Sequence, residues 1–188
     1  MLTLLETIKC LDGKCFHLPY HLARLNASRK KLGFNKPLKL VLKPPKKGLY
    51  RCRFIYAEDI IKIEYLPYEM RLPHSFKLIH SDIDYELKHE NRKDLNKLFI
   101  QKEEADEIII IKNGLITDTS IANLCFYDGK KWLTPTRPLL YGTTRQRLLD
   151  EKKIHTADIS YTDIHKFSKI ALINAMIDFQ IIENAILT

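Results

Sequence analysis

The start of the chain alternates apolar and polar residues in a way that predicts a hairpin followed by a helix. Residues 4–10 have the pattern of a strand, Asp12-Gly13 is typical of a two-residue turn, and residues 14–17 have the pattern of the returning strand. Pro19 suits the first turn of a helix, where its missing N–H costs nothing, and Gly33 marks the end of that helix. We therefore expect a strand, a turn, a strand and a helix in this order.

Two more strand-like runs follow, over residues 50–57 and 60–67. In the first run, basic residues alternate with apolar or aromatic ones, so Arg51 and Arg53 should share one face of the strand. A register shift of one residue would turn both side chains to the other face. The stretch between Pro67 and Pro73 is then the predicted boundary between two lobes.

The remainder of the chain predicts a longer series of strands and helices. These elements are a strand at 76–80, a helix from about 85 to 105, strands at 108–111, 123–127 and 131–133, helices at about 143–151 and 162–166, and a final strand at 170–173. The mixture of antiparallel hairpins and helices indicates an α/β (α+β) architecture in two lobes. The predicted parts are a small N-terminal α/β lobe over residues 1–69, a linker over 70–75 and a larger C-terminal lobe over 76–188.

The composition narrows the class of protein. There is no apolar run of about 18 residues, and no basic stretch precedes the first apolar residues, so we expect neither a membrane span nor a signal peptide. The four cysteines form no CxxC pair, and the simplest interpretation is reduced thiols in a cytoplasmic protein. The net charge of +8 favours solubility first, an anionic small molecule second and nucleic acid last.

Four features have residue types that a phosphorylated pyridine cofactor needs. Lys88 is a candidate amine, and Asp118, after a strand and a tight turn, is a candidate partner for a pyridine nitrogen. The stretch from Gly142 to Arg145 opens a helix, whose N–H groups and hydroxyls suit a phosphate, and Arg24 can add a bidentate contact. Taken singly, these residues are equally typical of a surface lysine, a turn aspartate, a helix cap and a solvated arginine. The seven histidines lack metal-ligand spacing, and no metal site is predicted.

Five segments, taken together and in order, resemble a known family. They are His21–Ser28, Lys88–Arg92, Asn113–Leu124, Leu133–Pro135 and Leu140–Arg145. The ordered set resembles the class IV pyridoxal-phosphate enzymes, which include branched-chain aminotransferases, D-amino-acid aminotransferases and 4-amino-4-deoxychorismate lyase. The resemblance spans about Leu5 to Ile181 and implies the two-lobed fold of D-amino-acid aminotransferase, with the cofactor held by the C-terminal lobe.

The resemblance also implies roles for individual residues. Lys88 matches the lysine that forms a Schiff base with pyridoxal 5'-phosphate and moves the proton during catalysis. Asp118 matches the partner of the pyridine nitrogen, although the family usually has a glutamate there. The other implied positions are phosphate contacts at Arg24, Gly142, Thr143 and Thr144, an apolar contact with the ring at Leu140, and a late loop near phosphate and substrate carboxylate at Asn174 and Ala175.

Within the family, Lys88–Arg92 looks most like the lyase branch, and Thr7 falls where lyase members place an early threonine. The implied reaction converts 4-amino-4-deoxychorismate, a small anionic substrate, to 4-aminobenzoate and pyruvate. Thr7 is then a candidate proton relay, and Arg51 and Arg53 are candidates for the substrate carboxylates. The alternatives are an aminotransferase acting on branched-chain or D-amino acids, and a catalytically inactive descendant or basic binding protein.

Two further expectations come from the resemblance. Family members are homodimers, so a second copy of this chain is the expected partner. The resemblance begins almost at the strand of Glu6 and Thr7, so the first strand and loop of a standard member are expected to be missing. Part of the usual wall of the pocket would then be absent or supplied in another way.

Overall fold

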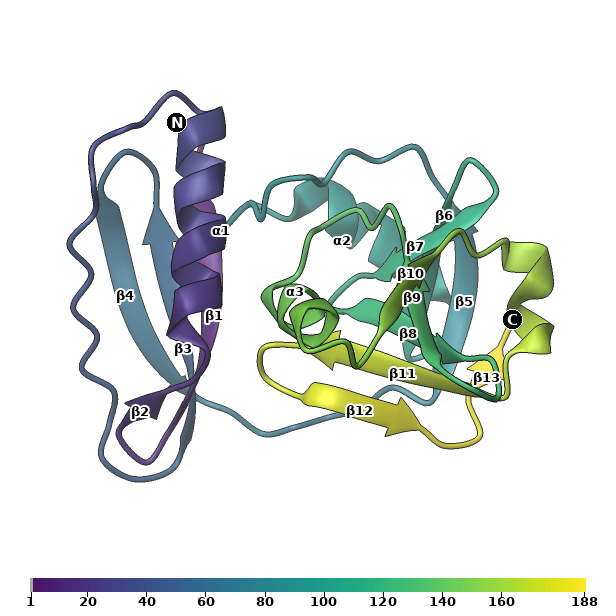
Figure 1. Cartoon of the computed structure of the whole chain (residues 1–188). Coiled ribbons are helices and arrows are strands. Elements are labelled where there is room, and N and C mark those ends of the chain that lie inside the picture. Colours follow the sequence, from purple (N-terminus) through teal and green to yellow (C-terminus); the bar gives the residue numbers. More distant parts are fainter. Residues whose placement is uncertain (1) are drawn as a thin grey trace. The chain divides into compact units, whose positions relative to one another are not determined.

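The computed structural model describes residues 2–188 and divides the chain into two compact units, each described here by itself (Figure 1). The first unit contains Met1–Met70 and Leu87–Asn91, and the second contains Arg71–Glu86 and Arg92–Thr188. The sequence predicted one C-terminal lobe over the whole of 76–188, whereas the structure groups Leu87–Asn91 with the first unit. No helix in the described residues is both long enough and apolar enough to span a membrane.

The first unit is a four-stranded antiparallel sheet with one helix. Its elements are β1 (Leu4–Leu11), β2 (Lys14–Cys15), α1 (Leu18–Lys31), β3 (Leu49–Tyr56) and β4 (Ile60–Pro67), and the strand order is β2-β1-β3-β4. The predicted hairpin, helix and two strands are confirmed. Asp12 and Gly13 both have positive φ, at 46° and 79°, as a tight turn between β1 and β2 requires.

Helix α1 covers one face of this sheet (Figure 1). Leu25 of the helix packs in a buried cluster with Leu4, Phe54 and Tyr56 of the sheet. Because successive residues of a strand point to opposite faces, the neighbours of these three sheet residues point away from the helix. The sheet therefore has a helix-covered face and an opposite face. The candidate site residues of this unit differ in which of the two faces they occupy.

The predicted helix from about 85 to 105 is wrong in its first part. The structure has a shorter helix, α2 (Lys93–Phe99), followed by the 3-10 turn η1 (Ile100–Lys102). The residues before α2 include a tight turn at the edge of β1, where the His89 N–H donates to the Leu87 carbonyl at 2.9 Å. In the same place the Leu5 N–H donates to the Lys88 carbonyl at 2.9 Å and His89 bridges Leu4. Leu87 packs against the cluster under α1, and pairing with the free edge of β1 stabilises this backbone over a helix.

The second unit is built around a nine-stranded mixed sheet. Its elements are β5 (Ser75–His80), β6 (Glu107–Lys112), β7 (Leu115–Thr119), β8 (Asn123–Tyr127), β9 (Trp132–Pro135), α3 (Thr143–Asp150), β10 (His155–Ala157), the 3-10 segment η2 (Tyr161–Lys166), β11 (Lys169–Asn174), β12 (Asp178–Ile182) and β13 (Ile186–Leu187). The strand order is β10-β9-β8-β7-β6-β5-β13, with β11 paired to β8 and β12. Parallel and antiparallel pairs occur in the same sheet, which agrees with the predicted α/β class.

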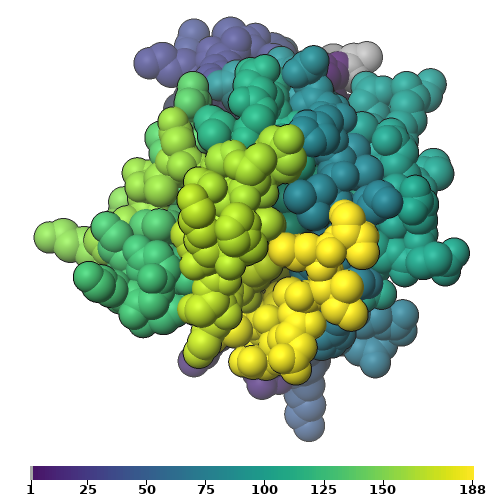
Figure 2. Space-filling model, turned by 90° about the vertical axis from the view of Figure 1, so that its right-hand side faces the viewer, coloured from purple at the N-terminus to yellow at the C-terminus, as the bar shows by residue number. Residues whose placement is uncertain are grey.

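Four strands of this sheet were absent from the prediction. One of them is β7, which returns from β6 and carries Asp118. β10 and β13 have only three and two residues, which is too short for a periodic pattern, and each pairs parallel with a partner distant in sequence. β12 returns from β11 as a hairpin, so β11 is not the final strand. The predicted helix over 162–166 is a 3-10 segment. The C-terminal residues, yellow in Figure 2, lie on the surface of the second unit.

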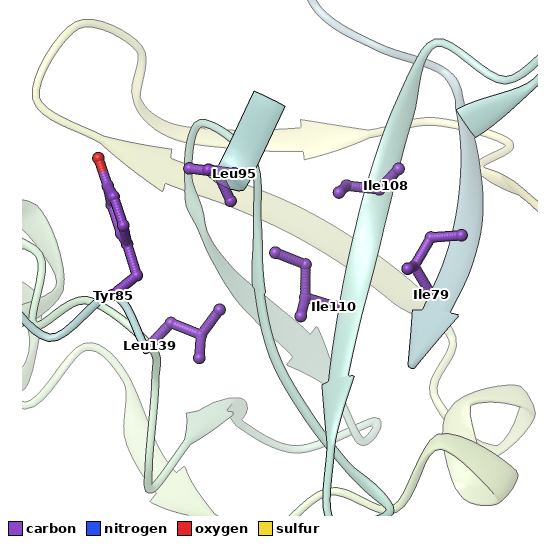
Figure 3. Packing of buried hydrophobic residues seen from close by; sticks show 6 residues of the cluster. All are labelled: Ile79, Tyr85, Leu95, Ile108, Ile110 and Leu139. Atoms are coloured by element: carbon purple, nitrogen blue, oxygen red, sulfur yellow. The ribbon is translucent and has the colours of Figure 1, made fainter. Parts of the chain in front are cut away.

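The core of the second unit lies along β6, whose residues Ile108–Ile111 are fully buried. Figure 3 shows Ile108 and Ile110 between Ile79 of β5 and Tyr85, with Leu95 of α2 and Leu139 beside them. The partly buried Leu140 packs against the same cluster. This packing fixes the loop that leads into α3, because Leu139 and Leu140 lie shortly before the first residue of that helix.

Candidate active site

One row of residues crosses the opposite face of the first sheet. Thr7 of β1 is the direct partner of Arg53 in β3, and Arg53 is the direct partner of Glu64 in β4. Glu6, the neighbour of Thr7, bonds to α1 and therefore points to the helix-covered face. Thr7 and Arg53 consequently lie on the face that α1 leaves open.

Lys88 lies on this same face. His89 is opposite Leu4 and Lys88 is opposite Leu5 in the pairing with β1, so the register assigns Lys88 to the side of Leu5 and Thr7. The contacts of Glu90 agree, since its carboxylate accepts from the Thr3 hydroxyl at 3.2 Å and lies 3.8 Å from Arg53. Lys88 is opposite Leu5 in the pairing with β1, two positions along the strand from Thr7. At that diagonal spacing, of roughly 7–8 Å between backbones, a lysine side chain can reach a threonine hydroxyl.

Arg51 and Arg53 share this face but differ in their partners. The Arg53 guanidinium pairs with Glu64 at 3.4 Å and with Glu90 at 3.8 Å, so its charge is already balanced. Arg51 is opposite Lys9, another cation, and its Nε is buried without a hydrogen-bond partner in the described residues. Like charges placed opposite each other in a sheet repel, and an anion bound on this face would relieve the repulsion. Arg51 is therefore the better candidate for a substrate carboxylate.

Arg24 lies on the helix-covered face. Its Nε and Nη2 donate to the two oxygens of Glu6 at 2.8 and 2.6 Å, and His21 bonds the same carboxylate at 2.7 Å. Glu6 is buried, which alone would raise its pKa, but Arg24 and His21 hold the pKa at about 2. Within the first unit, the structure therefore does not bring Arg24 together with Thr7 and Lys88.

In the second unit, Asp118 is a strand residue and not the turn aspartate that the sequence indicated. It lies in β7, opposite Asn123 of β8, and is only 4% exposed. Its Oδ1 accepts from the Asn123 amide at 2.7 Å, and its Oδ2 accepts from the Leu140 N–H at 2.8 Å. Burial raises the pKa of Asp118 to about 7, although both of these hydrogen bonds act in the other direction.

Asn123 is a site residue that the sequence reasoning missed. Its amide nitrogen donates both to Asp118 and, at 2.8 Å, to the Leu140 carbonyl. Its side-chain oxygen lies against Gly142, where an added Cβ would come within 2.0 Å of it. A glycine is thus needed at 142 for close approach and not for its backbone angles. The signal in the sequence was an asparagine that follows the turn after Asp118 and opens the next strand.

The predicted phosphate-binding segment lies at the start of helix α3. Gly142 is the N-cap, and Thr143 and Thr144 are buried at the first two positions of the helix. No side chain caps the helix, so the first-turn N–H groups are not engaged by a cap. Arg145 donates from its guanidinium to the Pro135 carbonyl at 2.8 Å, which anchors the start of the helix. Backbone donors, threonine hydroxyls and a helix dipole are a suitable donor set for a phosphate.

The late loop at Asn174 and Ala175 is held by its own asparagine. Asn174 Oδ1 accepts from the N–H groups of Met176 and Ile177 at 2.9 and 3.1 Å, and its amide donates to the Ile121 carbonyl at 3.3 Å. The loop is thereby tied to the segment between Asp118 and Asn123. Asn174 therefore supports the shape of the loop, and Ala175 follows it in the same turn.

Pyridoxal phosphate fits the donor set of the second unit. A buried carboxylate with a raised pKa is stabilised by a nearby cation, and a protonated pyridine nitrogen is such a cation. Leu140 offers an apolar side chain next to that carboxylate, and Thr143 and Thr144 begin the helix shortly afterwards. The carboxylate, the apolar contact and the phosphate donors are therefore close together in this unit.

The family follows from a comparison with known proteins. The model of the amino-transferase class IV family matches residues 80–185. The chain belongs to the class IV aminotransferases. The predicted family, the two-part α/β fold and the enzyme class are confirmed, and pyridoxal phosphate is the cofactor of this family. The matched range begins within β5 and includes Lys88, Asp118, α3 and Asn174.

Several relatives of similar length are known. An uncharacterized protein of Haemophilus influenzae is 39% identical over 185 residues, covering 94% of this chain and 98% of the relative. A crystal structure from Haemophilus somnus, named a "putative 4-amino-4-deoxychorismate lyase", is 38% identical with a TM-score of 0.85, covering 94% of this chain and 97% of that one. A Schizosaccharomyces pombe protein named "Putative aminodeoxychorismate lyase" is 29% identical over 172 residues, covering 78% of this chain and 73% of the relative.

Longer proteins share the fold. The branched-chain amino acid aminotransferase from Escherichia coli has a TM-score of 0.75 at 15% identity, and the match covers 99% of this chain and 76% of that one. The chain therefore matches nearly the whole length of the two Haemophilus relatives, and about three quarters of the length of the Escherichia coli enzyme.

Proposed function

We propose that this class IV enzyme is a pyridoxal-phosphate-dependent lyase that converts 4-amino-4-deoxychorismate to 4-aminobenzoate and pyruvate. The observation that carries the proposal is the shared face of Thr7 and Lys88 in the first unit. A lysine amine and a threonine hydroxyl on one face supply two groups that can exchange protons with one substrate. The names of the Haemophilus somnus and Schizosaccharomyces pombe relatives support the same reaction.

Individual residues have proposed roles toward the cofactor. Asp118 would pair with the pyridine nitrogen, Leu140 would pack on the ring, and Lys88 would bind the aldehyde carbon through its amine. The residues proposed for the phosphate and the adjoining loop are Gly142, Thr143, Thr144 and Asn174. Arg24 would reach the phosphate only through a guanidinium nitrogen that Glu6 does not bind. Bound pyridoxal phosphate supplies an electron sink that eases removal of a proton from the carbon bearing the substrate amine.

Two side chains are proposed to transfer protons during the reaction. The Lys88 amine would take the proton from the ring carbon that bears the substrate amine. The Thr7 hydroxyl relays a proton toward the leaving enolpyruvyl group. Departure of that group leaves an aromatic ring, which provides a strong driving force and makes a keto-acid acceptor unnecessary. Lys88 is thus the proposed catalytic base, and Thr7 the proposed relay.

Anion recognition is assigned to Arg51. Its buried, unpartnered Nε and the facing Lys9 favour a carboxylate on this face. Arg53 keeps its ion pairs with Glu64 and Glu90 and has a smaller proposed part in substrate binding. Ala175 is proposed to border the substrate, because the turn held by Asn174 presents it.

An aminotransferase acting on branched-chain or D-amino acids is the second candidate function. The description of the matching family model favours it, because that model is named for amino transfer. The two reactions differ in what they require. The lyase consumes one substrate and needs no keto acid, whereas an aminotransferase cycles its cofactor between aldehyde and amine forms.

The experiment that tests the proposal uses the purified, cofactor-loaded enzyme with 4-amino-4-deoxychorismate and no keto acid. We expect equal amounts of 4-aminobenzoate and pyruvate. Thr7→Val should lower kcat by about a hundredfold and Thr7→Ser by much less, because serine keeps the hydroxyl. Thr3→Val, on the same face, is the matched control. Absence of product, together with bleaching by an amino acid and recovery with a keto acid, would establish the aminotransferase instead.

We also propose a homodimer, a small anionic substrate and a cytoplasmic location. The family membership and the position of Arg51 opposite Lys9 support the first two. No nucleic-acid or membrane partner is proposed. Light scattering of the purified protein tests the dimer, and a molar mass of one chain would exclude it.

A further inference from the structure

Two cysteines face each other across the first hairpin. Cys10 of β1 and Cys15 of β2 are direct partners in the strand register, and their sulfur atoms are 3.0 Å apart. A disulfide needs a sulfur separation of about 2.05 Å, so the thiols are roughly 1 Å from bonding distance. All four cysteines are free thiols in this structure.

The backbone register also suits a disulfide. The neighbouring pair is hydrogen-bonded, since the Phe16 N–H donates to the Lys9 carbonyl at 2.9 Å. Hydrogen-bonded and non-hydrogen-bonded pairs alternate along an antiparallel ladder, so Cys10 and Cys15 form a non-hydrogen-bonded pair. Such pairs have Cα atoms about 4.5 Å apart, which is within the range of about 4.4–6.8 Å for disulfides. Little backbone movement is needed to join the two sulfurs.

A third thiol lies in the same cluster. Cys52 of β3 packs with Cys10 and Ile8 in the buried core of the hairpin, with Cys15 against them. Its register partner is Ile8, so Cys52 is diagonal to Cys10 and not opposite to it. Diagonal backbones are about 7–8 Å apart, which is beyond the usual disulfide range. The Cys52 thiol also forms a hydrogen bond with the Cys10 thiol. The backbone register nevertheless favours Cys15 over Cys52 as the disulfide partner of Cys10.

We propose that Cys10 and Cys15 are a modification site, at which a two-electron oxidant forms a reversible disulfide. With a hydroperoxide, the Cys15 sulfur first becomes a sulfenic acid as the peroxide O–O bond breaks. The Cys10 sulfur then displaces water to form the S–S bond. The two thiols lose two electrons and two protons, and hydrogen peroxide is reduced to two molecules of water. This proposal does not depend on the reaction that the enzyme catalyses.

Exposure sets the order of these steps. Cys15 is half-buried, whereas Cys10 and Cys52 are at most 1% exposed, so an oxidant reaches Cys15 first. Burial, together with the hydrogen bond to Cys10, raises the pKa of Cys15 to about 12. The thiolate is the reactive form, so oxidation should accelerate as the pH rises from 7 toward 9.

The disulfide would join two parts of the first unit that carry candidate site residues. Cys10 lies on β1, which also contains Thr7, and Cys15 lies three residues before the first residue of α1. Helix α1 carries Arg24, whose guanidinium is bound to Glu6 of β1. Oxidation would therefore link β1, the strand that contains Thr7, covalently to the segment that precedes α1.

The test uses the full-length, cofactor-loaded enzyme treated with hydrogen peroxide, then alkylated and digested with trypsin without reduction. Cleavage after Lys14 separates the two cysteines, so the expected product is a linked pair of peptides, residues 10–14 and 15–24. Two thiols per chain should be lost and recovered with dithiothreitol. Cys52→Ser should form the same pair, and Cys15→Ser should form none.

Three outcomes would overturn the proposal. These are a link to Cys52 or Cys125, retention of four free thiols after peroxide treatment, and conversion of Cys15 to a sulfinic acid that dithiothreitol does not reverse. Since the main measurement is made on the unsubstituted protein, the proposal remains testable even where a serine variant folds poorly.

Discussion

The side-chain amide of Asn123 joins Asp118 to the loop before α3. It donates to the Asp118 carboxylate at 2.7 Å and to the Leu140 carbonyl at 2.8 Å, while the Leu140 N–H donates back to Asp118 at 2.8 Å. The proposed partner of the pyridine nitrogen and the proposed contact with the ring are thus held by one closed set of hydrogen bonds. Gly142, which precedes the predicted phosphate-binding threonines, lies next to the side-chain oxygen of the same asparagine.

Replacing this asparagine should weaken cofactor binding without removing any proposed cofactor contact. Asn123→Ala leaves the Leu140 carbonyl and one Asp118 oxygen without this donor, and such a loss costs about 1–3 kcal/mol. We expect the Kd for pyridoxal phosphate to rise about tenfold or more in a fluorescence titration of the cofactor-free protein. Asn96→Ala, in the exposed part of α2, is the control. An unchanged Kd in Asn123→Ala would contradict the positioning role.

The buried Asp118 should make the cofactor-free protein less stable as the pH rises. Its pKa in the folded protein is about 7, above its ordinary value of 3.8, so the folded state holds the proton more strongly. Stability is then fully present below pH 3.8 and declines between pH 3.8 and 7, by a total on the order of 4 kcal/mol. Urea unfolding over this range measures it.

Two comparisons isolate the contribution of Asp118. Asp118→Ala should flatten the decline in the free energy of unfolding between pH 4 and 7. Saturating pyridoxal phosphate should make this decline smaller in the unsubstituted protein, since a cation next to the Asp118 carboxylate favours its ionised form. The same slope in Asp118→Ala would show that another group is responsible, such as Glu107, whose pKa burial also raises.

The ion pair of Glu6 has the opposite pH dependence. The pKa of Glu6 falls from 4.5 to about 2 on folding, so its stabilisation is present above pH 4.5 and is lost as the pH falls toward 2. Glu6→Gln should lower the free energy of unfolding at pH 7 by about 3 kcal/mol, since it leaves Arg24 without its buried partner. The control is Glu64→Gln, which removes a more exposed pair and should cost much less, because solvent screens exposed ion pairs. Equal losses in the two variants would contradict the assigned difference.

Arg51 and Arg53 should respond differently to the same substitution. Arg51→Met should raise KM for the anionic substrate by about tenfold or more with a small change in kcat, because it removes a group that binds substrate and transition state alike. Arg53→Met should have a smaller effect, since Glu64 and Glu90 already balance its charge. Steady-state kinetics of both variants test this, and a larger KM effect in Arg53→Met would reverse the assignment.

Local patterns in the sequence predicted the elements that form locally. The hairpin at Asp12-Gly13, the helix after Pro19 and the buried strand from Ile108 to Ile111 all have strong local signals, and all are present. The family was also predictable, because its motifs keep their order along the chain.

Elements defined by distant partners were not predictable. The segment around Lys88 is rich in charged residues and was expected to be helical, but it forms a tight turn that pairs with the edge of β1, more than 80 residues earlier. The two shortest strands of the second unit, β10 and β13, likewise exist only through parallel partners. Asn123 was missed for the same reason, since its role depends on Leu140 and Gly142 in another part of the chain.

The identity of the lysine that binds the cofactor is the central claim, and one measurement tests it directly. Borohydride reduction of the cofactor-loaded enzyme makes the lysine–cofactor bond permanent, and peptide mapping then locates it. We predict a pyridoxyl group on Lys88, within a tryptic peptide of residues 78–92 in which cleavage after Lys88 is blocked. Lys93→Ala should give the same result. A pyridoxyl group on any other lysine, or no modified peptide from a protein with bound cofactor, would contradict the account.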